Sequence, residues 1–383
     1  MTATPPPAGT ASAGSASPAR DLGARVPPVL VEATRDGAVE ARHRGDVAIV
    51  GPGGAVAGVG DPHAVSYPRS ALKPFQSSAC AEVIAAASLQ PDAPPGGEGL
   101  VGRARAIASA SHESSDAHQV EAAHVLSLGG LDEAALACPP ALPADLATLR
   151  RQPEPMRLAH NCSGKHAAMA WAQAVLTGAP DGYTDPASAL QERIAARIAS
   201  WCGAALDVPG VDGCGAPAWR LPLSALAGGF ARLAAAADEA LDPDATRGAD
   251  ATREAGATRE AGELGATARA MRAHPWLVGG SSADDTALMR ADGRVVAKRG
   301  AEGVLAAGFA GPAGPVGVAV KIEDGATRAK GPALAAALAA LGAQVPEEVR
   351  APPVLGGGAP RGALTASASF AEAVAAAAAE CLQ

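Results

Sequence analysis

Residues 29–50 read VLVEATRDGAVEARHRGDVAIV. Positions 29–34 are mostly apolar or β-branched, the Arg-Asp-Gly at 35–37 is typical of a turn, and positions 38–44 return to a strand-like pattern. The apolar run at 46–50 continues as a further strand after the glycine that precedes it. The stretch therefore predicts an antiparallel sheet whose first strands lie near the start of the chain.

The pattern downstream of Pro68 is helical, and it returns to strands only in the last third of the chain. Apolar residues recur at helical spacing from Leu72 to Ile84. Strands on both sides of a long helical block favour an α+β fold, in which an antiparallel sheet is built from both chain ends beside a helical middle region. Further helices are expected at 116–128, 164–177, 186–203, 222–240 and 367–382, and further strands near 294–298, 302–309 and 316–322.

Two segments differ in composition from the rest of the expected domain, residues 27–383. Residues 1–26 are rich in Pro, Ala, Ser and Gly, and they predict a disordered tail because they bury too little surface to offset the entropy cost of ordering. Residues 245–262 repeat a short polar unit that begins Ala-Thr-Arg. The unit is too short for a solenoid repeat, so we interpret it as a low-complexity surface insertion between two helices, without a role in chemistry.

The charge and composition of the 383-residue chain limit its partners. A net charge of −8 argues against a nucleic-acid binder, which needs a basic face to neutralise phosphates. The sequence contains no membrane-span candidate of ~20 uncharged apolar residues, and its first residues lack the basic and then apolar order of a secretory signal. Six cysteines are too sparse for a disulfide framework, so reduced thiols or metal ligands are expected. We expect a cytoplasmic protein whose partner is a small molecule.

Ser70 and Lys73 form the first candidate group for catalysis. They follow Pro68, which suits the start of a helix, and their spacing of three places them on one helical face. A serine hydroxyl is a poor nucleophile until a base removes its proton, and a neutral lysine one turn away can act as that base. The alternative is a capping serine followed by an exposed lysine.

Two later segments carry groups that could join this pair. Ser111 and His112 follow a run of small residues, where Ser111 could relay protons and His112 could bind a substrate. Lys298 stands at the end of an expected strand and could point into a cleft that faces Ser70. The alternatives are a simple helix cap after the first segment and a surface hairpin at the second.

Two distant cysteines form the candidate metal site. Cys162, Lys165 and His166 share one helical face, and Cys214 stands between glycines that let the backbone approach closely. Thiolates with nearby nitrogen donors could bind Zn²⁺. The spacing contains no Cys-x-x-Cys pair, so two buried small hydrophobic side chains are the alternative.

These segments, taken together and in this order, resemble the asparaginase II family, the Rhizobium-type asparaginases. The resemblance extends from about residue 29 to residue 382. It rests on the motifs PRSALKPFQ (68–76), SH (111–112), NCSGKH (161–166), DGCGAP (212–217), KRGAEGV (298–304) and KIEDG (321–325).

The resemblance implies a fold similar to that of serine β-lactamases and glutaminases, together with a homodimer. It also implies that Ser70 and Lys73 form one Ser-Lys pair, that Ser111 completes a proton relay, and that Lys298 supplies a second amine. The implied reaction is hydrolysis of asparagine to aspartate and ammonia through an acyl-enzyme on Ser70, with Lys73 as the base.

A zinc ion held by Cys162, Lys165 and Cys214 is the implied cofactor, and we expect it to orient the substrate rather than supply the nucleophile. Two alternatives remain open: a β-lactamase-like acyl hydrolase that uses the same serine, and a zinc-dependent or zinc-binding protein. The candidate substrate-binding residues are Arg69, His112, His166, Asp212 and Gly213.

Overall fold

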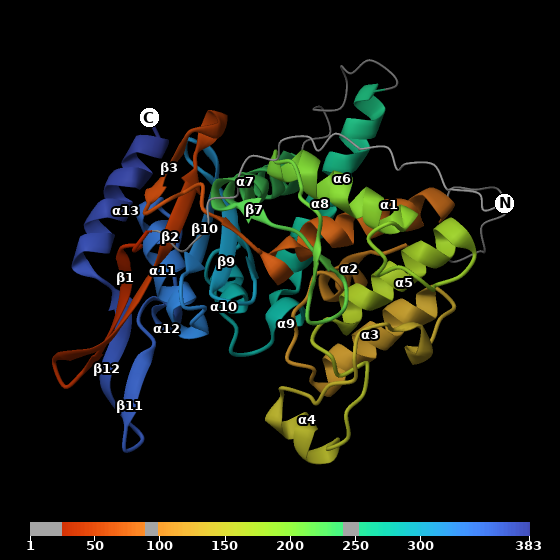
Figure 1. The fold of residues 1–383 in the computed structure, drawn as a ribbon, viewed down its shortest axis with the longest axis horizontal. Coiled ribbons are helices and arrows are strands. Elements are labelled where there is room, and N and C mark those ends of the chain that lie inside the picture. Colours follow the sequence, from red (N-terminus) through yellow and green to blue (C-terminus); the bar gives the residue numbers. More distant parts are fainter. Residues whose placement is uncertain (1–24, 89–98, 240–252) are drawn as a thin grey trace, which may run out of the picture.

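The computed structural model describes residues 25–88, 99–239 and 253–383 (Figure 1). Two pairs of short strands, β4 (Val65–Ser66) with β7 (Leu221–Pro222) and β5 (Gly210–Val211) with β6 (Pro217–Ala218), lie outside the main sheet. The strands of the main sheet are β1 (Val29–Arg35), β2 (Ala38–Val50), β3 (Val56–Val59), β8 (Val296–Arg299), β9 (Val304–Gly311), β10 (Gly314–Ile322), β11 (Pro353–Gly356) and β12 (Ala359–Ala366).

The main sheet has eight strands, and all of its pairings are antiparallel. Its order is β11-β12-β1-β2-β10-β9-β8, with β3 pairing β2 beside that path. Strands from the start and the end of the chain therefore meet in one sheet, and the middle of the chain lies to one side of it (Figure 1). This arrangement agrees with the predicted α+β class and with a sheet built from both chain ends.

Helices form the rest of the described chain. The α-helices are α1 (Lys73–Ser88), α2 (Gly102–Ala108), α3 (Asp116–Leu128), α4 (Leu146–Arg151), α5 (Ser163–Thr177), α6 (Ala189–Cys202), α7 (Leu223–Glu239), α8 (Arg253–Ala273), α9 (Pro275–Gly279), α10 (Asp284–Ala291), α11 (Thr327–Ala340), α12 (Glu347–Arg350) and α13 (Ala368–Cys381). Short 3₁₀ turns are η2 (Pro52–Gly54), η3 (Arg69–Leu72) and η4 (Glu133–Ala135). None of the helices in the described ranges has both the length and the apolar character needed to cross a membrane.

The hairpin between β1 and β2 forms where the sequence predicts it. Arg35 pairs with Ala38, and the two turn residues Asp36 and Gly37 have φ values of 45° and 84°. Two positive φ angles are typical of the type I′ turn, whose twist matches that of the flanking strands. The Asp-Gly pair therefore sets the register of the first two strands.

Strand β2 does not break at Gly45, as the sequence pattern predicted, but runs on to Val50. A Cβ atom at Gly45 would lie 2.3 Å from the carbonyl oxygen of Lys321 on β10. Glycine here lets two strands approach closely, so it serves the pairing rather than a turn. The prediction of separate strands at 38–44 and 46–50 is wrong for this reason.

Helix α7 covers one face of the sheet, and α11 and α13 lie on the other (Figure 1). Glycines in the strands bring α7 close: a Cβ at Gly317 would lie 1.9 Å from the carbonyl oxygen of Ala227, and one at Gly308 would lie 2.1 Å from that of Phe230. The ring of Phe230 also meets Phe75 of α1 edge-on, with centroids 6.0 Å apart. Helix α7 thus joins the sheet to α1, the helix that carries Lys73.

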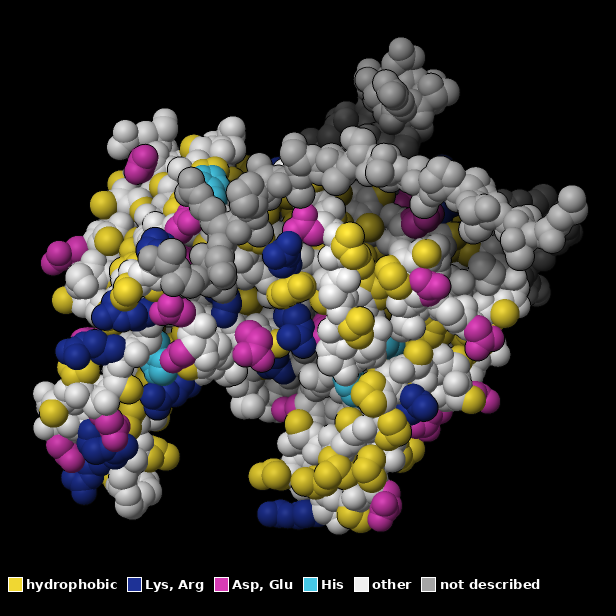
Figure 2. Space-filling model, in the orientation of Figure 1, with side chains coloured by type: hydrophobic (Ala, Val, Ile, Leu, Met, Phe, Trp, Pro, Cys, Tyr) yellow, Lys and Arg dark blue, Asp and Glu magenta, His cyan; other side chains and the backbone are white. Residues whose placement is uncertain are grey.

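Two regions extend beyond the body of the molecule on the same side. They are the β11–β12 hairpin and the segment that contains α4 (Figure 1). The space-filling view is indented between them, and basic side chains gather over the hairpin (Figure 2). The hairpin turns at Gly357 and Gly358, with φ values of 59° and 80°. The sequence analysis did not predict this hairpin or helix α11.

The segments singled out by composition are only partly described. Residues 1–24 of the expected tail lie outside the described residues, whereas the Arg25 guanidinium contacts Asp46. Residues 245–252 of the repeat are also outside the description, but 253–262 form the first half of α8, since Ala, Glu and Arg favour helices. Within that helix, Glu260 accepts a hydrogen bond from the Trp201 indole at 3.4 Å.

Candidate active site

Ser70 lies in η3, the turn that leads into α1, and it lines a cavity of about 470 Å³. Arg69, directly before it, has a φ of 53°, a conformation that residues with side chains rarely adopt. A Cβ at Gly300 would lie 2.3 Å from the carbonyl oxygen of Pro68, so the turn packs tightly beside the end of β8. Strained backbone and close packing together fix the position of Ser70 at the cavity.

Lys73 is buried at the first position of α1, and its amine donates hydrogen bonds to three acceptors. Its Nζ donates to the carbonyl oxygen of Ala110, to Ser111 Oγ at 3.0 Å and to Cys162 Sγ at 3.1 Å. Three donated bonds use every proton of an ammonium group, and Lys298 also donates three, to Ser111, Asp285 and the Arg299 carbonyl. Among the described residues the Ser70 hydroxyl makes no hydrogen bond, so Ser70 and Lys73 are close in the chain without being hydrogen-bonded.

Ser111 stands between the two lysines that the sequence analysis selected. Its Oγ lies 3.0 Å from Lys73 Nζ and 3.0 Å from Lys298 Nζ. Lys73 comes from the helical region and Lys298 from strand β8, so the hydroxyl connects the two parts of the fold. The Ser111 backbone is held in turn by a bond from its N–H to the Val278 carbonyl at 2.9 Å.

Lys298 is completely buried, and that burial sets its protonation. Burial lowers the pKa of Lys298 well below its ordinary value, and the positive charge of Lys73 lowers it further. The carboxylate of Asp285 lies 3.4 Å from the amine and raises the pKa of Lys298, but it does not cancel the effect of burial. The same carboxylate also forms an ion pair with Arg299. Burial raises the pKa of Asp285, but Arg299 and Lys298 outweigh that effect and lower it to about 2. Burial and the neighbouring positive charge therefore favour loss of the Lys298 proton, although its Nζ donates to Ser111 Oγ, Asp285 Oδ2 and the Arg299 carbonyl.

The predicted metal residues form a separate cluster of buried thiols. Lys165 Nζ donates to Cys214 Sγ at 3.0 Å. A hydrogen bond with Cys214 lowers the pKa of Cys162 well below its usual value, and the charges of Lys73 and Lys165 add to this effect against burial. Burial lowers the pKa of Lys165, but the two cysteines outweigh it and raise the pKa above its ordinary value. The cluster therefore holds thiolate and ammonium together.

The local structure explains why Cys162 is suited to this state. It is the N-cap residue of α5, where the helix dipole favours negative charge. A Cβ at Gly164 would lie 2.3 Å from the carbonyl oxygen of Ile107, so glycine lets the start of α5 approach α2. All six cysteines of the chain are buried and unpaired, in agreement with the expected reduced thiols.

The chemistry of this cluster fits a soft divalent metal. Cys162 and Cys214 supply two sulfur ligands, and Lys165 supplies a nitrogen ligand once its proton has left. His166 lies next along the helix; its Nδ1 is 2.8 Å from the Tyr183 hydroxyl, whereas its buried Nε2 has no hydrogen-bond partner among the described residues. Within those residues no group of three or more His, Cys, Asp or Glu is placed to hold a metal. A metal held by Cys162 and Cys214 would therefore need the Lys165 amine as its third protein ligand.

Arg69 and Asp212, two candidate substrate-binding residues, bind each other. Arg69 donates to Asp212 Oδ1 from Nε at 2.8 Å and from Nη2 at 2.6 Å. The same oxygen accepts the N–H of Gly213 at 2.6 Å. The ion pair fastens the loop that carries Cys214 to the turn that carries Ser70.

His112 and His166 are both buried and neutral. Burial lowers the pKa of His112 well below its ordinary value, and it lowers that of His166 to about 4. His112 contacts Ser163 Oγ at 3.1 Å and stacks on His118, with ring centroids 5.1 Å apart. The structure places these two candidates in the packing behind the site, and neither lines the cavity beside Ser70.

Several charged residues at this cavity were missed by the sequence analysis. Arg299 donates from Nη2 to the Ser111 carbonyl at 2.5 Å, although it lies within a motif already quoted. Arg328 lines the cavity, and its Nε donates to His43 Nε2 at 3.0 Å. His43 Nδ1 lies 2.9 Å from Asp324, an acidic residue of the KIEDG motif. Of the motifs quoted in the sequence analysis, only KIEDG includes a residue of the Arg328–His43–Asp324 contacts.

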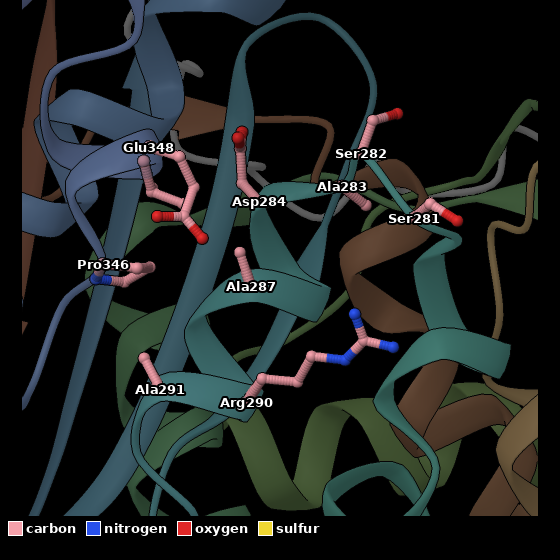
Figure 3. A pocket seen from close by; sticks show the side chains of 10 residues that line it. Ser281, Ser282, Ala283, Asp284, Ala287, Arg290, Ala291, Pro346 and Glu348 are labelled. Carbon is pink, nitrogen blue, oxygen red and sulfur yellow. The ribbon is translucent and has the colours of Figure 1, made fainter.

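A second cavity of about 500 Å³ adjoins the first (Figure 3). Ser282, Ala283 and Asp284 line both cavities. The second is also lined by Arg290 of α10 and Glu348 of α12, and it contains none of the serine, lysine or cysteine candidates. Asp284 therefore stands on the wall between the two spaces.

A comparison with protein-family models matches residues 31–365 to the family described as L-asparaginase II. The match includes every candidate catalytic, binding and metal residue named above. A search of curated proteins found no match.

Proposed function

The chain belongs to the L-asparaginase II family, and from that premise we propose that it cleaves the side-chain amide of L-asparagine through an acyl-enzyme on Ser70. The family assigns an amidohydrolase activity on a small amide substrate. The observation that carries the mechanism is the position of Ser111, which lines the same cavity as Ser70 and whose hydroxyl lies 3.0 Å from each of two buried lysine amines.

Activation of Ser70 begins with a proton transfer between the lysines. In this proposal Lys73 begins as the charged amine, because burial lowers the pKa of Lys298 well below its ordinary value. Ser111 accepts a proton from Lys73 and passes its own hydroxyl proton to Lys298, so the two amines share one charge. Lys73 is then neutral and can take the proton of Ser70 as the hydroxyl attacks the amide carbon.

The tetrahedral intermediate carries its negative charge on the former amide oxygen. Ser70 stands in the first turn of η3, where backbone N–H groups have no partner within the helix. The N–H of Ser70 is our candidate donor to this oxyanion. Loss of one such donor typically costs roughly 10²–10³ in rate.

Departure of ammonia reverses the proton transfer. The C–N bond breaks as the amide nitrogen takes a proton from the Lys73 ammonium, which leaves an aspartyl ester on Ser70 and a neutral amine. Water then attacks the ester while the same amine accepts the water proton. Aspartate leaves, and the Ser70 hydroxyl regains its proton.

Zinc is the proposed cofactor, with Cys162, Lys165 and Cys214 as its ligands. When bound, it would supply positive charge that orients the amide substrate. Lys73 connects this cluster to the relay because its amine donates to both Ser111 and Cys162. Because Lys165 binds metal only without its proton, occupancy rises with pH.

The family resemblance also supports three broader proposals. These are a fold related to serine β-lactamases and glutaminases, a homodimer, and a cytoplasmic location. The antiparallel sheet built from both chain ends supports the first of them.

The nucleophile is tested by Ser70→Ala, with Ser282→Ala as a matched serine control from the same cavity. Ammonia release from asparagine should fall to background in Ser70→Ala and stay near the wild-type rate in Ser282→Ala. Mass spectrometry of acid-quenched wild-type protein should find an aspartyl adduct on the peptide that contains Ser70. Substantial turnover by folded Ser70→Ala would instead favour attack by a metal-bound hydroxide, and cleavage of nitrocefin would favour a β-lactamase-like hydrolase.

A further inference from the structure

Asp284 is a carboxylate without a partner at the reaction cavity. It begins α10, is half-buried, and lines the same cavity as Ser70 and Ser111. Within the described ranges its side chain makes no hydrogen bond and no ion pair. A Cβ at Gly331 would lie 3.0 Å from both of its carboxylate oxygens, so the carboxyl group packs against the α11 backbone and has little room on that side.

Lys330 and Arg299 act on Asp284 through their charges, but neither forms an ion pair or hydrogen bond with it among the described residues. Lys330 of α11 donates to the Gly300 carbonyl at 3.3 Å, and Arg299 of β8 donates to the Gly279 carbonyl at 2.9 Å. Asp285, the next residue, takes the ion pairs with Lys298 and Arg299. Two adjacent aspartates therefore differ: one is neutralised inside the protein, and the other meets the cavity unpaired.

An unpaired carboxylate in a partly desolvated site is costly unless a ligand supplies positive charge. Burial raises the pKa of Asp284 to about 6, and neighbouring Asp285 adds to this rise while Lys330 and Arg299 oppose it. The acyl-transfer groups account for the amide end of asparagine, but they offer nothing to its α-ammonium group. Among the described residues that line this cavity, Asp284 is the one carboxylate.

We propose that Asp284 binds the α-ammonium group of the substrate and makes the enzyme selective for α-amino acid amides. The inference rests on the proposed reaction at Ser70. An ammonium group that enters the cavity gives Asp284 the charged partner it lacks. An amide with the same carbon chain and no amino group leaves the carboxylate unpaired.

Succinamate tests this inference, because it is asparagine without the α-amino group. Wild-type enzyme should prefer asparagine over succinamate by roughly 30-fold or more in kcat/KM, the typical cost of leaving one partner of a desolvated charge pair alone. Asp284→Asn should abolish most of this preference by raising KM for asparagine, with kcat little changed. The matched control is Glu348→Gln, a carboxylate of the neighbouring cavity (Figure 3), which should keep the preference.

The pH dependence of wild-type enzyme gives a second readout that needs no variant. Asp284 binds an ammonium only when ionised, so the preference for asparagine should decline as pH falls through about 6. Lys330, Arg299 and Asp285 act on its pKa, and with a pKa of about 2 Asp285 does not titrate in this range. Arg328 lines the reaction cavity with Asp284, and Arg290 and Glu348 line the second cavity with it. A preference that persists in folded Asp284→Asn, or that stays constant between pH 7 and 5, would overturn the inference. Neither result depends on which group is the nucleophile, because Ser70→Ala tests that separately.

Discussion

Lys73 lies between two clusters in which the pKa of a second lysine shifts in opposite directions. On one side, Ser111 connects it to Lys298, whose pKa burial lowers well below its ordinary value. On the other, Cys162 and Cys214 raise the pKa of Lys165 above its ordinary value. Both lysines are buried, so burial alone does not decide the charge.

The difference lies in the neighbours. Lys165 faces Cys214 and Cys162, whose charges raise its pKa, and the pKa of Cys162 is lowered in turn. Lys298 has one carboxylate partner, Asp285, and that carboxylate also serves Arg299, while Lys73 adds repulsion. A buried amine stays protonated where negative charge matches it and is driven neutral where positive charges outnumber it. One side therefore favours proton transfer, and the other favours a buried thiolate beside an ammonium group.

The largest expected effect concerns the proton relay. Lys73→Ala and Lys298→Ala should each lower kcat by roughly 10²–10⁴, the usual range for loss of a general acid or base. The double variant should lose far less than the product of the two effects, because Ser111 can pass a proton only when both amines are present. Single-turnover ammonia release between pH 7 and 9 gives the comparison.

Lys73→Arg sharpens this test. A guanidinium keeps a positive charge near Ser111 but stays protonated, so it cannot accept the Ser70 proton and should be as inactive as the alanine variant. Near wild-type turnover by Lys73→Arg would contradict general-base catalysis by Lys73.

Substitutions in the thiol cluster should lower the free energy of unfolding. In metal-free protein, Cys214→Ala removes the hydrogen-bond partner of the Lys165 ammonium, and an uncompensated buried charge costs about 3–5 kcal/mol. Adding Lys165→Met should recover much of the loss, because it removes the stranded charge. Urea unfolding of both variants measures the difference, and equal stability of Cys214→Ala and wild type would mean that Lys165 is not charged there.

Metal content should separate two cysteines from the other four. Cys162→Ala and Cys214→Ala should lose bound zinc and weaken substrate binding. Elemental analysis of all six alanine variants decides the point, and equal zinc loss in a variant outside the predicted pair would refute the site. The controls are Cys80, Cys138, Cys202 and Cys381, each buried.

The smallest effect is expected far from both clusters. Deletion of 245–262 should leave kcat and KM within about twofold of wild type, since residues 253–262, in the first half of α8, do not line the cavity beside Ser70. It also removes the contacts of Glu260 with Trp201 and with the buried Arg197, so stability should fall while turnover is kept. A deletion variant that stays folded but loses turnover would mean that the repeat shapes the site.

Local pattern was enough to predict much of the secondary structure. The Asp-Gly turn at 36–37 gave the first hairpin because both residues accept positive φ, and the apolar period after Pro68 gave α1. The same reasoning failed at Gly45, where glycine looks like a break but permits close strand pairing. It also missed the β11–β12 hairpin, whose glycines obscure the alternation of a strand.

The sequence by itself determined which residues are available for chemistry and, through the ordered motifs, the family. It also set their local spacing, because a helix brings Cys162 and Lys165 to one face whatever the rest of the fold does. Only the tertiary structure placed Ser111 between lysines 187 and 38 residues away in the chain. It also gave adjacent Asp284 and Asp285 different environments. The physical reason is that charge state and reactivity depend on burial and on neighbours from distant elements, which no local pattern encodes.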